Sequence, residues 1–519
     1  MKKKNIILIS VFLGSGILFS SCSDYLDSDK YFEDRITINK VFTSKQRSQQ
    51  WLAYAFSFLK NENADVVGKE KETNSFTFAD DMYYGDRDVN YDSKEWNELS
   101  YNTFMQGQYN EDNFNQAWTM CYKGIYQASV FINNIDMNTE MTDKERLDYK
   151  GQARFVRAYY YWLLLRRYGP VPIVPNEGID YTQSYEQIAI PRNSYEEVVD
   201  YISNEMIQAA KEIQYTKRDG ENCARPTKGA CLATRALALI YSASPLANGN
   251  NDTYAKSLVD DKGKELLNST YKEEKWAKAA AACRDVMELG VYDLYHASFN
   301  TTEAVGDPKT IVPADSTCIF AQNTWPKGWK NIDPFKSYRV LFSGDIAPED
   351  NTELIFSRID QNATEINHSM KSFARHSMPR DFGGWNTHGL TQKMVDAYYM
   401  NDGSDCPGKD RELNGGNGTE RLTGFTTLQD YQQGKYKPLA ANVSLQYANR
   451  EPRFYASVGY NGSVWEYLSD PEPTHHNRQT FYYRGSGNGY NNSQFYLRTG
   501  ISVKKYVNQT DVPDREDYR

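Results

Sequence analysis

An internal repeat of helix-forming sequence is the feature that most constrains the fold of this chain. Lys150-Gly151 recurs 78 residues later as Lys228-Gly229, and Arg157-Ala158 recurs at the same offset as Arg235-Ala236. The small residues let a neighbouring helix approach closely in both copies. The repeat therefore predicts stacked helix pairs, each of which buries its apolar face against the next pair.

Apolar residues at helical spacing predict that the first half of the chain is mainly helical. Capping boxes that begin at Thr142 and Ser194 mark the starts of two long helices, and Gly290 stands at the expected C-terminal cap of the last one. The predicted helices cover residues 44–61, 112–137, 142–168, 194–213, 227–244 and 273–289. This pattern resembles a tetratricopeptide array with an insertion, although ordinary antiparallel helix packing selects the same small residues.

From Tyr295 onward, glycine, asparagine, proline and aromatic residues replace the long helical patterns. We predict one helix near residues 391–399 and short strands near 354–359 and 455–460. Long loops on a rigid scaffold are where binding residues usually lie. The predicted fold class is mainly α: a tetratricopeptide-like helical-repeat scaffold over residues 44–295, followed by a loop-rich, mixed ligand-binding layer over residues 296–519.

The amino terminus has the pattern of a secretory signal. Three lysines at residues 2–4 precede an apolar stretch over residues 6–19, which is too short to favour a membrane-spanning helix. Phe19-Ser20-Ser21-Cys22 resembles the bacterial lipobox, so we predict a signal peptide over residues 1–21, a lipid on Cys22 and a tether over residues 22–43. An ordinary cleaved signal that happens to precede a cysteine is the alternative.

Composition excludes several classes of partner. Lys and Arg number 59 against 68 Asp and Glu, a net charge of −9, so nucleic acid is not an expected partner and any membrane contact would be through the lipid anchor alone. The mean hydropathy of −0.72 argues against a polytopic membrane protein. Aromatic residues make up 14% of the chain and include 40 tyrosines. Tyrosine combines a flat apolar ring with a polar tip and suits a wet recognition surface.

The sequence lacks the motifs of the common catalytic and metal sites. It contains no H-E-x-x-H, no G-x-S-x-G, no P-loop and no Cys/His spacing typical of zinc. We expect no cofactor and no metal, and we expect the histidines at 368, 376, 388, 475 and 476 to be solvated. Cys121, Cys231 and Cys283 lie in helical patterns and are expected to be free core residues, with a Cys223–Cys231 disulfide left open.

Several stretches resemble the SusD/RagB family of outer-membrane lipoproteins. The most specific is Ala-Arg-Phe-Val-Arg-Ala-Tyr-Tyr-Tyr at residues 153–161, followed by Tyr-Gly-Pro-Val-Pro at 168–172. Residues 22–27, 226–236, 391–403 and 450–454 match further blocks in the family's order. Family members usually continue past a block like Lys504-Lys505-Tyr506 into a final helix pair, so we expect this sequence to be a fragment.

The resemblance implies a non-catalytic nutrient-binding lipoprotein, anchored by lipid to the outer membrane and facing the cell exterior. It implies four tetratricopeptide-like units and a partner, a TonB-dependent SusC-like barrel that receives the captured ligand. The usual ligand is a glycan. The alternative is a peptide or protein ligand, as in RagB-like members, and a glycoside hydrolase is a remote alternative because acidic pairs are common in this chain.

Loop tryptophans supply the candidate ligand residues. Trp51, Trp118, Trp162 and Trp276 lie on helical stripes and are predicted to pack in the core, whereas Trp96, Trp325, Trp329, Trp385 and Trp465 lie in loop-like sequence. Loops near residues 80–96 and 325–339 often build the ligand site in the family. The candidates are Asp81, Tyr84, Trp96, Trp325, Trp329, Tyr338 and Arg339. The alternative is that these aromatic residues only pin long loops to the scaffold.

Overall fold

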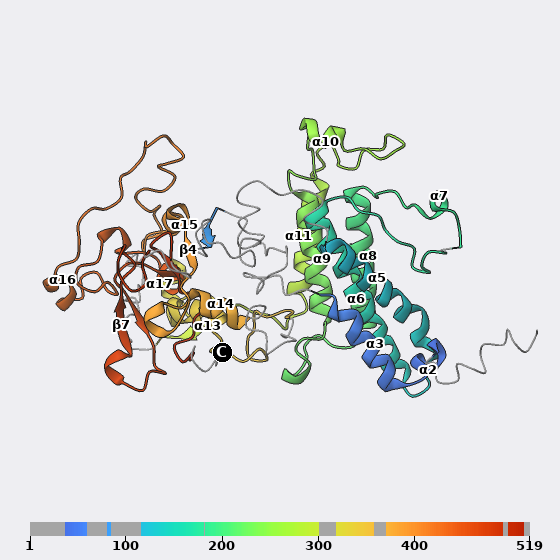
Figure 1. Cartoon of the computed structure of the whole chain (residues 1–519), viewed down its shortest axis with the longest axis horizontal. Helices are drawn as coiled ribbons and strands as arrows, with labels where there is room; N and C mark the ends of the chain where they lie inside the picture. The colour runs from blue at the N-terminus through green and yellow to red at the C-terminus, as the bar shows by residue number, and fades with distance from the viewer. Residues whose placement is uncertain are drawn as a thin grey trace, which may run out of the picture.

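The computed structural model describes residues 37–59, 80–84, 116–180, 182–299, 318–357, 370–490 and 497–512, which form two lobes side by side (Figure 1). The predicted signal peptide and Cys22 lie outside these residues. The first lobe is helical and contains α2 (Ile38–Phe42), α3 (Lys45–Ser57), α5 (Gln116–Asn134), η4 (Ile135–Met137), α6 (Asp143–Tyr168), α7 (Tyr185–Ile188), α8 (Tyr195–Glu212), η5 (Gly220–Asn222), α9 (Lys228–Ala243), α10 (Thr253–Ser257) and α11 (Glu274–Met287). This lobe confirms the predicted helical-repeat scaffold.

Local sequence fixes where the long helices begin. The Thr142 hydroxyl accepts a hydrogen bond from the Glu145 backbone N–H at 3.3 Å, and the Glu145 carboxylate accepts one from the Thr142 N–H at 2.8 Å. Ser194 and Glu197 form the same reciprocal pair at the start of α8. Each cap satisfies backbone donors that the first helical turn leaves unpaired, which stabilises a helix by about 1 kcal/mol.

The repeated glycines mark equivalent close contacts in the two helix pairs. A Cβ atom on Gly151 of α6 would lie 2.9 Å from the backbone nitrogen of Ile213, at the end of α8. A Cβ atom on Gly229 of α9 would lie 2.0 Å from the hydroxyl of Tyr292, just after α11. At each glycine, the missing side chain therefore lets the segment at the end of the next long helix pack closely: the end of α8 against α6, and the residues after α11 against α9.

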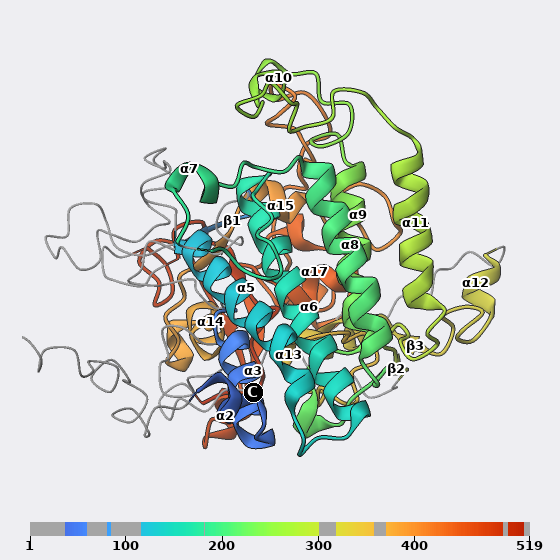
Figure 2. The same ribbon diagram turned by 90° about the vertical axis from the view of Figure 1, so that its right-hand side faces the viewer.

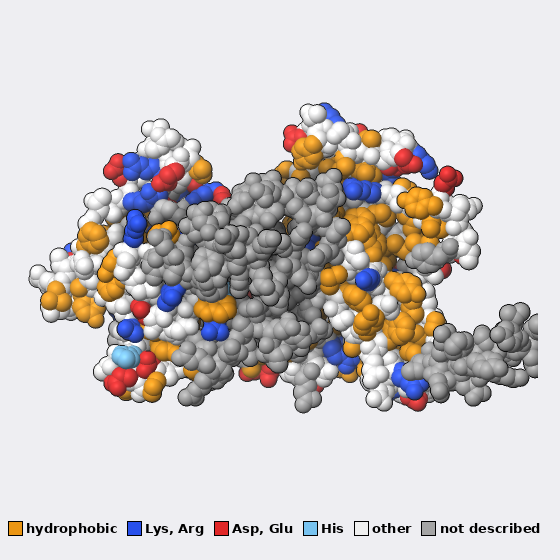
Figure 3. Space-filling view, viewed as in Figure 1, with side chains coloured by type: hydrophobic (Ala, Val, Ile, Leu, Met, Phe, Trp, Pro, Cys, Tyr) orange, Lys and Arg blue, Asp and Glu red, His pale blue; other side chains and the backbone are white. Residues whose placement is uncertain are grey.

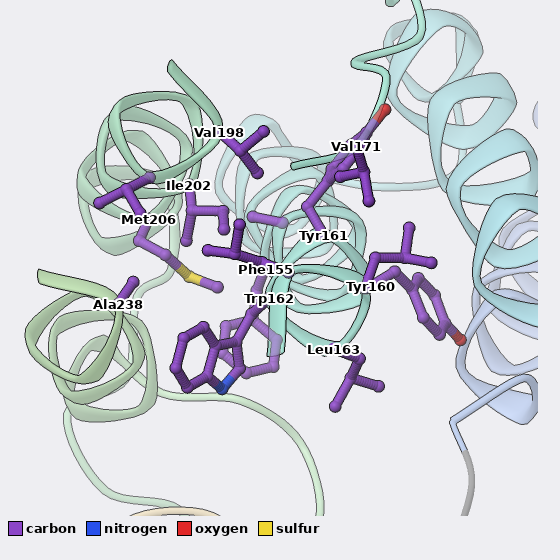
Figure 4. Close-up of a cluster of buried hydrophobic side chains, with 14 of the residues drawn as sticks. Phe155, Tyr160, Tyr161, Trp162, Leu163, Val171, Val198, Ile202, Met206 and Ala238 are labelled. Carbon is purple, nitrogen blue, oxygen red and sulfur yellow. The ribbon is translucent and has the colours of Figure 1, made fainter. Parts of the chain in front are cut away.

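The core of the first lobe surrounds α6, which is buried along most of its length. Figure 4 shows Phe155 and Trp162 of α6 beside Ile202 and Met206 of α8 and Ala238 of α9. The aromatic residues of α6 also make polar contacts with neighbouring segments. The Tyr160 hydroxyl donates to the carbonyl of Ala55 on α3 at 2.6 Å, and the Tyr161 hydroxyl accepts from the Val174 N–H at 2.9 Å.

The second lobe consists of short elements joined by long loops. They are β1 (Met82–Tyr84), β2 (Ala297–Ser298), α12 (Ile319–Gln322), β3 (Ile332–Asp333), α13 (Pro334–Ser343), α14 (Met370–Ser377), η7 (Arg380–Phe382), β4 (His388–Leu390), α15 (Gln392–Ala397), α16 (Leu428–Gln432), η8 (Leu445–Tyr447), α17 (Pro452–Ser457), β5 (Val458–Gly459), β6 (Ser463–Glu466), η9 (Pro473–His475), β7 (Asn477–Thr480) and β8 (Ser502–Val503). A four-stranded antiparallel sheet has the order β1-β4-β8-β5, and β2-β3 and β6-β7 are separate two-stranded sheets.

Strand β1 carries an early part of the chain into the second lobe. Met82 pairs with Leu390 and Tyr84 with His388, more than 300 residues further along the chain. The pairing places Asp81 in the same lobe as α13. Residues 80–84, the described start of the first candidate loop, therefore belong to the same lobe as the second candidate loop.

Several sequence-based expectations for the second lobe were wrong. Residues 455–460 are not a strand, because α17 continues to Ser457 and only Val458–Gly459 are extended. Residues 354–357 form no strand, and 358–359 lie outside the described residues. Trp465 is buried although its sequence is loop-like, and Trp276 of α11 is 40% exposed although it lies on a helical stripe.

No disulfide joins the described cysteines, Cys223 and Cys231 included; Cys121 and Cys231 are buried as expected, whereas Cys283 is half-buried. No described helix has both the length and the apolar character needed to cross a membrane. Hydrophobic side chains are prominent on the face of the helical lobe seen in Figure 3. The exposed ones in this lobe include Tyr54, Tyr126, Tyr185, Leu237 and Tyr241.

Candidate functional site

Residues 318–333 form a compact loop that carries Trp325 and Trp329. Figure 2 shows α12, at the start of this loop, projecting at one side of the molecule next to β2 and β3. The Trp329 N–H donates to the Phe320 carbonyl at 3.0 Å, and the Lys330 N–H donates to the Asn323 carbonyl at 3.0 Å. A Cβ atom on Gly328 would lie 2.1 Å from the Phe320 carbonyl oxygen, so only glycine allows this closure.

Two rings of this loop face solvent as a nearly parallel pair. The Phe320 and Trp329 rings are 6.1 Å apart between centroids, with 18° between their planes. Trp329 is 39% exposed, and Phe320 is more exposed still. Trp325 is half-buried, with its ring 5.2 Å from the imidazole of His296. We call Phe320 and Trp329 the ring pair.

The loop is joined directly to α13, which carries Tyr338 and Arg339. The Asp333 carboxylate caps α13 by accepting a hydrogen bond from the Lys336 N–H at 3.0 Å. The Ala297 N–H of β2 donates to the hydroxyl of Ser337 at 2.9 Å. The ring pair therefore has a rigid connection to the middle of the second lobe.

Tyr338 lies close to Tyr398 and Tyr506, and we call these three residues the tyrosine cluster. The ring of Tyr338 is 5.1 Å from that of Phe342 and 5.3 Å from the Nζ atom of Lys505. Burial raises the pKa of Tyr506 to about 12, and the neighbouring Tyr338, Tyr398 and Asp81 add to the rise. Tyr338 and Asp81, from the two candidate loops, thus both lie close enough to Tyr506 to affect its ionisation.

Asp81 stands at the start of β1 and is held there by Thr391. The Thr391 N–H donates to the Asp81 carbonyl at 3.0 Å, and the Thr391 hydroxyl donates to the Asp80 carbonyl at 2.6 Å. Atom Oδ1 of Asp81 is buried and accepts no hydrogen bond from the described residues. Buried carboxylate oxygens are normally satisfied, so this atom has an unused acceptor position.

The remaining candidates are placed differently. The guanidinium of Arg339 forms an ion pair with the buried carboxylate of Glu466 at 3.0 Å, which ties α13 to β6. Tyr84 pairs in the sheet through its backbone, while its side chain and the whole of Trp96 lie outside the description. The structure therefore brings Asp81 and Tyr338 to the tyrosine cluster and puts Trp325 and Trp329 in the adjoining loop.

Sequence reasoning missed three residues of this region. Phe320 was missed because no motif surrounds it. The only signal in the sequence is that Ile319 and Phe320 are two adjacent apolar residues shortly before Trp325 in a loop-like stretch. Tyr506 and Lys505 were noticed only as a block that resembles the family. Their role in the cluster depends on the fold, because Lys505 lies 3.7 Å from the ring centre of Phe342, far away in sequence.

The histidines at 376 and 388 are buried, which corrects the expectation that they are solvated. Their rings are 5.5 Å apart. The His376 imidazole shares a hydrogen bond of 2.5 Å with the Thr387 hydroxyl, and His388 shares one of 2.8 Å with the Ser377 hydroxyl. Within the residues that the structure describes, no three His, Cys, Asp or Glu side chains are grouped so as to hold a metal ion.

Comparison with protein families gives two matches. Residues 352–518 match a model described as the SusD family, and residues 24–241 match one described as "Starch-binding associating with outer membrane". A SusD-like protein of Bacteroides ovatus is 24% identical over 290 residues, which are 51% of this chain and 46% of that protein. SusD-like protein P25 of Formosa agariphila is 24% identical over 174 residues, which are 33% of this chain and 31% of that protein.

A solved structure of a SusD-like protein from Bacteroides fragilis has the same fold, with a TM-score of 0.59 and 17% sequence identity. The similarity covers 92% of this chain and 70% of that one. The chain thus spans less than half the length of the two curated relatives that it matches, and about seven-tenths of the solved one.

Proposed function

This chain belongs to the SusD/RagB family, and from that premise we propose that it captures glycans at the outer surface of a cell. The observation that carries the proposal is the ring pair of Phe320 and Trp329, which is exposed, nearly parallel and fixed by backbone hydrogen bonds. The C–H face of a sugar packs on such rings, while its hydroxyls need polar partners nearby.

The tyrosine cluster offers such polar partners. The partly exposed carboxylate of Asp81 can accept a hydrogen bond from a sugar hydroxyl, and the phenol of Tyr338 can donate or accept one. A ligand that extends from the ring pair along α13 would reach Tyr338 next. Trp325 supports the loop from behind through its contact with His296.

The same proposal includes the location and the partner. A lipid on Cys22 would anchor the protein to the outer membrane, and the name of the matching family model refers to that membrane. The protein would then pass its ligand, unchanged, to a SusC-like TonB-dependent barrel. Exposed apolar side chains on the helical lobe, such as Tyr126 and Leu237, offer a surface for a protein partner.

A Cys22→Ala variant tests the lipid anchor. The variant should leave the membrane fraction, and its retention in that fraction would contradict the anchor.

Affinity electrophoresis in a panel of neutral and acidic polysaccharides tests glycan capture. At least one polysaccharide should retard the wild-type protein, and Trp329→Ala should reduce the retardation. Trp276→Ala is the matched control, because Trp276 is 40% exposed but lies on α11 in the other lobe. Unchanged migration of the wild-type protein in every gel would overturn the proposal and favour a peptide ligand.

A further inference from the structure

A second exposed aromatic surface lies after β7, in the loop of residues 481–490. We propose that this loop is an additional glycan-binding surface, so that the protein holds a long polysaccharide in two places. This inference rests on the proposed glycan capture and goes further, because it makes the preferred ligand a long chain and assigns a binding role to Tyr483.

The loop exposes an aromatic ring, and two exposed arginines lie close to it in the sequence. Tyr483 is 60% exposed, and the half-buried ring of Phe481 lies behind it at 6.0 Å between centroids. Arg484 is exposed, with its guanidinium 5.8 Å from the centre of the Tyr490 ring. Among the described residues, neither Arg484 nor Arg478 of β7 forms an ion pair with a carboxylate. The Arg478 guanidinium donates one hydrogen bond to the Asp381 carbonyl at 3.4 Å, and its other N–H groups, like those of Arg484, can donate to sugar hydroxyl or carboxylate groups.

A buried polar network fixes the shape of this loop. The side-chain amide of the buried Asn488 donates to the Asp381 carboxylate at 2.6 Å, and the Asp381 N–H donates back to Asn488 at 3.2 Å. Asn386, also buried, donates to the Asn488 carbonyl at 2.7 Å. The exposed ring is thus held on a framework that does not have to become ordered when a ligand binds.

Two further contacts brace the backbone beneath Tyr483. The Ser486 N–H donates to the Tyr483 carbonyl at 3.0 Å. A Cβ atom on Gly489 would lie only 1.9 Å from the same carbonyl oxygen. Any residue other than glycine would therefore force the turn to shift. The loop is therefore built to hold Tyr483 in one position, whereas an aromatic ring that only covers the core would be buried.

The ring pair lies between β2 and β3, and Tyr483 follows β7, so different segments of the chain carry the two surfaces. Two weak surfaces that bind the same chain raise the overall affinity, whereas a ligand too short to reach both uses one alone. The inference therefore predicts that loss of Tyr483 weakens binding of long chains and leaves binding of short ones unchanged.

The experiment compares dissociation constants for the polysaccharide that retards the wild-type protein and for a short oligosaccharide prepared from it. Tyr483→Ala should weaken polysaccharide binding about 3–10-fold, as expected for loss of one stacking ring, and leave the oligosaccharide constant unchanged. Gly489→Ala, which shifts the turn but keeps the ring, should act in the same direction. Tyr431→Ala, at a ring 48% exposed on α16, is the matched control.

The outcomes separate this inference from the proposed function. If the wild-type protein binds a polysaccharide and Tyr483→Ala binds it equally well, the second surface is refuted and glycan capture stands. An equal loss for the polysaccharide and the oligosaccharide would also refute it, because Tyr483 would then belong to a single site. A wild-type protein that binds no polysaccharide overturns both proposals.

Discussion

Two buried imidazoles make the stability of this protein sensitive to mild acid. Burial lowers the pKa of His388 to about 3 and lowers that of His376 well below its usual value, and the positive charge of Arg375 adds to the effect on His376. Both rings are therefore neutral in the folded protein, whereas in the unfolded chain they take up protons near pH 6.5.

We expect the free energy of unfolding to be fully retained above about pH 6.5 and to fall as the pH decreases toward the folded-state pKa values. The slope should reach at most about 1.4 kcal/mol per pH unit for each imidazole. Urea unfolding between pH 7 and pH 5 measures this slope, because carboxylates contribute little to the pH dependence of stability in that range. A stability independent of pH in this range would contradict the prediction.

The tryptophans show how far the burial of a single side chain can be predicted from the sequence. Trp162 was correctly expected in the core, because it lies on a helix that neighbours surround on all sides. Trp276 lies on a similar stripe, but α11 is the last described helix of the array and leaves part of that ring exposed. Trp465 looked like a loop residue, yet pairing of β6 with β7 directs its side chain into the interior. Burial of a single ring depends on neighbours that are distant in the sequence.

At the scale of elements, the two repeats contain equivalent arginines in different surroundings. Arg157 of α6 is only 1% exposed and pairs with Glu205 of α8, whereas Arg235 of α9 pairs with Asp285 of α11, whose side chain is 47% exposed. A buried ion pair and an exposed one contribute very differently when one partner is removed.

Glu205→Gln should therefore destabilise the protein by about 3–5 kcal/mol, because it leaves a buried guanidinium without its counter-charge. Asp285→Asn, at the acid that pairs with the equivalent Arg235, should change stability by less than about 1 kcal/mol. Chemical denaturation of the two variants beside the wild type gives both numbers. Equal losses of stability in the two variants would contradict the claim that the buried ion pair contributes more than the exposed one.

Helices were easier to predict than strands for a physical reason. The starts of α6 and α8 follow from four-residue capping boxes, which are local. The start of α13 had a readable signal too, Asp333 followed by Pro334, although it was missed among the surrounding loops. In contrast, β4 and β8 are three and two residues long and exist only because they pair across more than 100 residues of chain.

At the scale of the whole molecule, the division into a helical scaffold and a loop-rich lobe could be predicted, because periodicity and composition change near Tyr295. The arrangement of the candidate site could not. Trp325, Trp329 and Tyr338 were chosen from loop sequence. The pairing of Trp329 with Phe320 depends on how loop 318–333 closes, and the approach of Asp81 to Tyr506 depends on the pairing of β1 with β4.

Calorimetric titration of the bound polysaccharide into four proteins tests the central claim, which is that Phe320 and Trp329 together form a glycan-binding surface. The proteins are the wild type, Phe320→Ala, Trp329→Ala and the double variant. Each single change should weaken binding about 3–10-fold, and the double variant should lose less than the product of both, because the rings contact one sugar face. Wild-type affinity in the double variant would contradict the account.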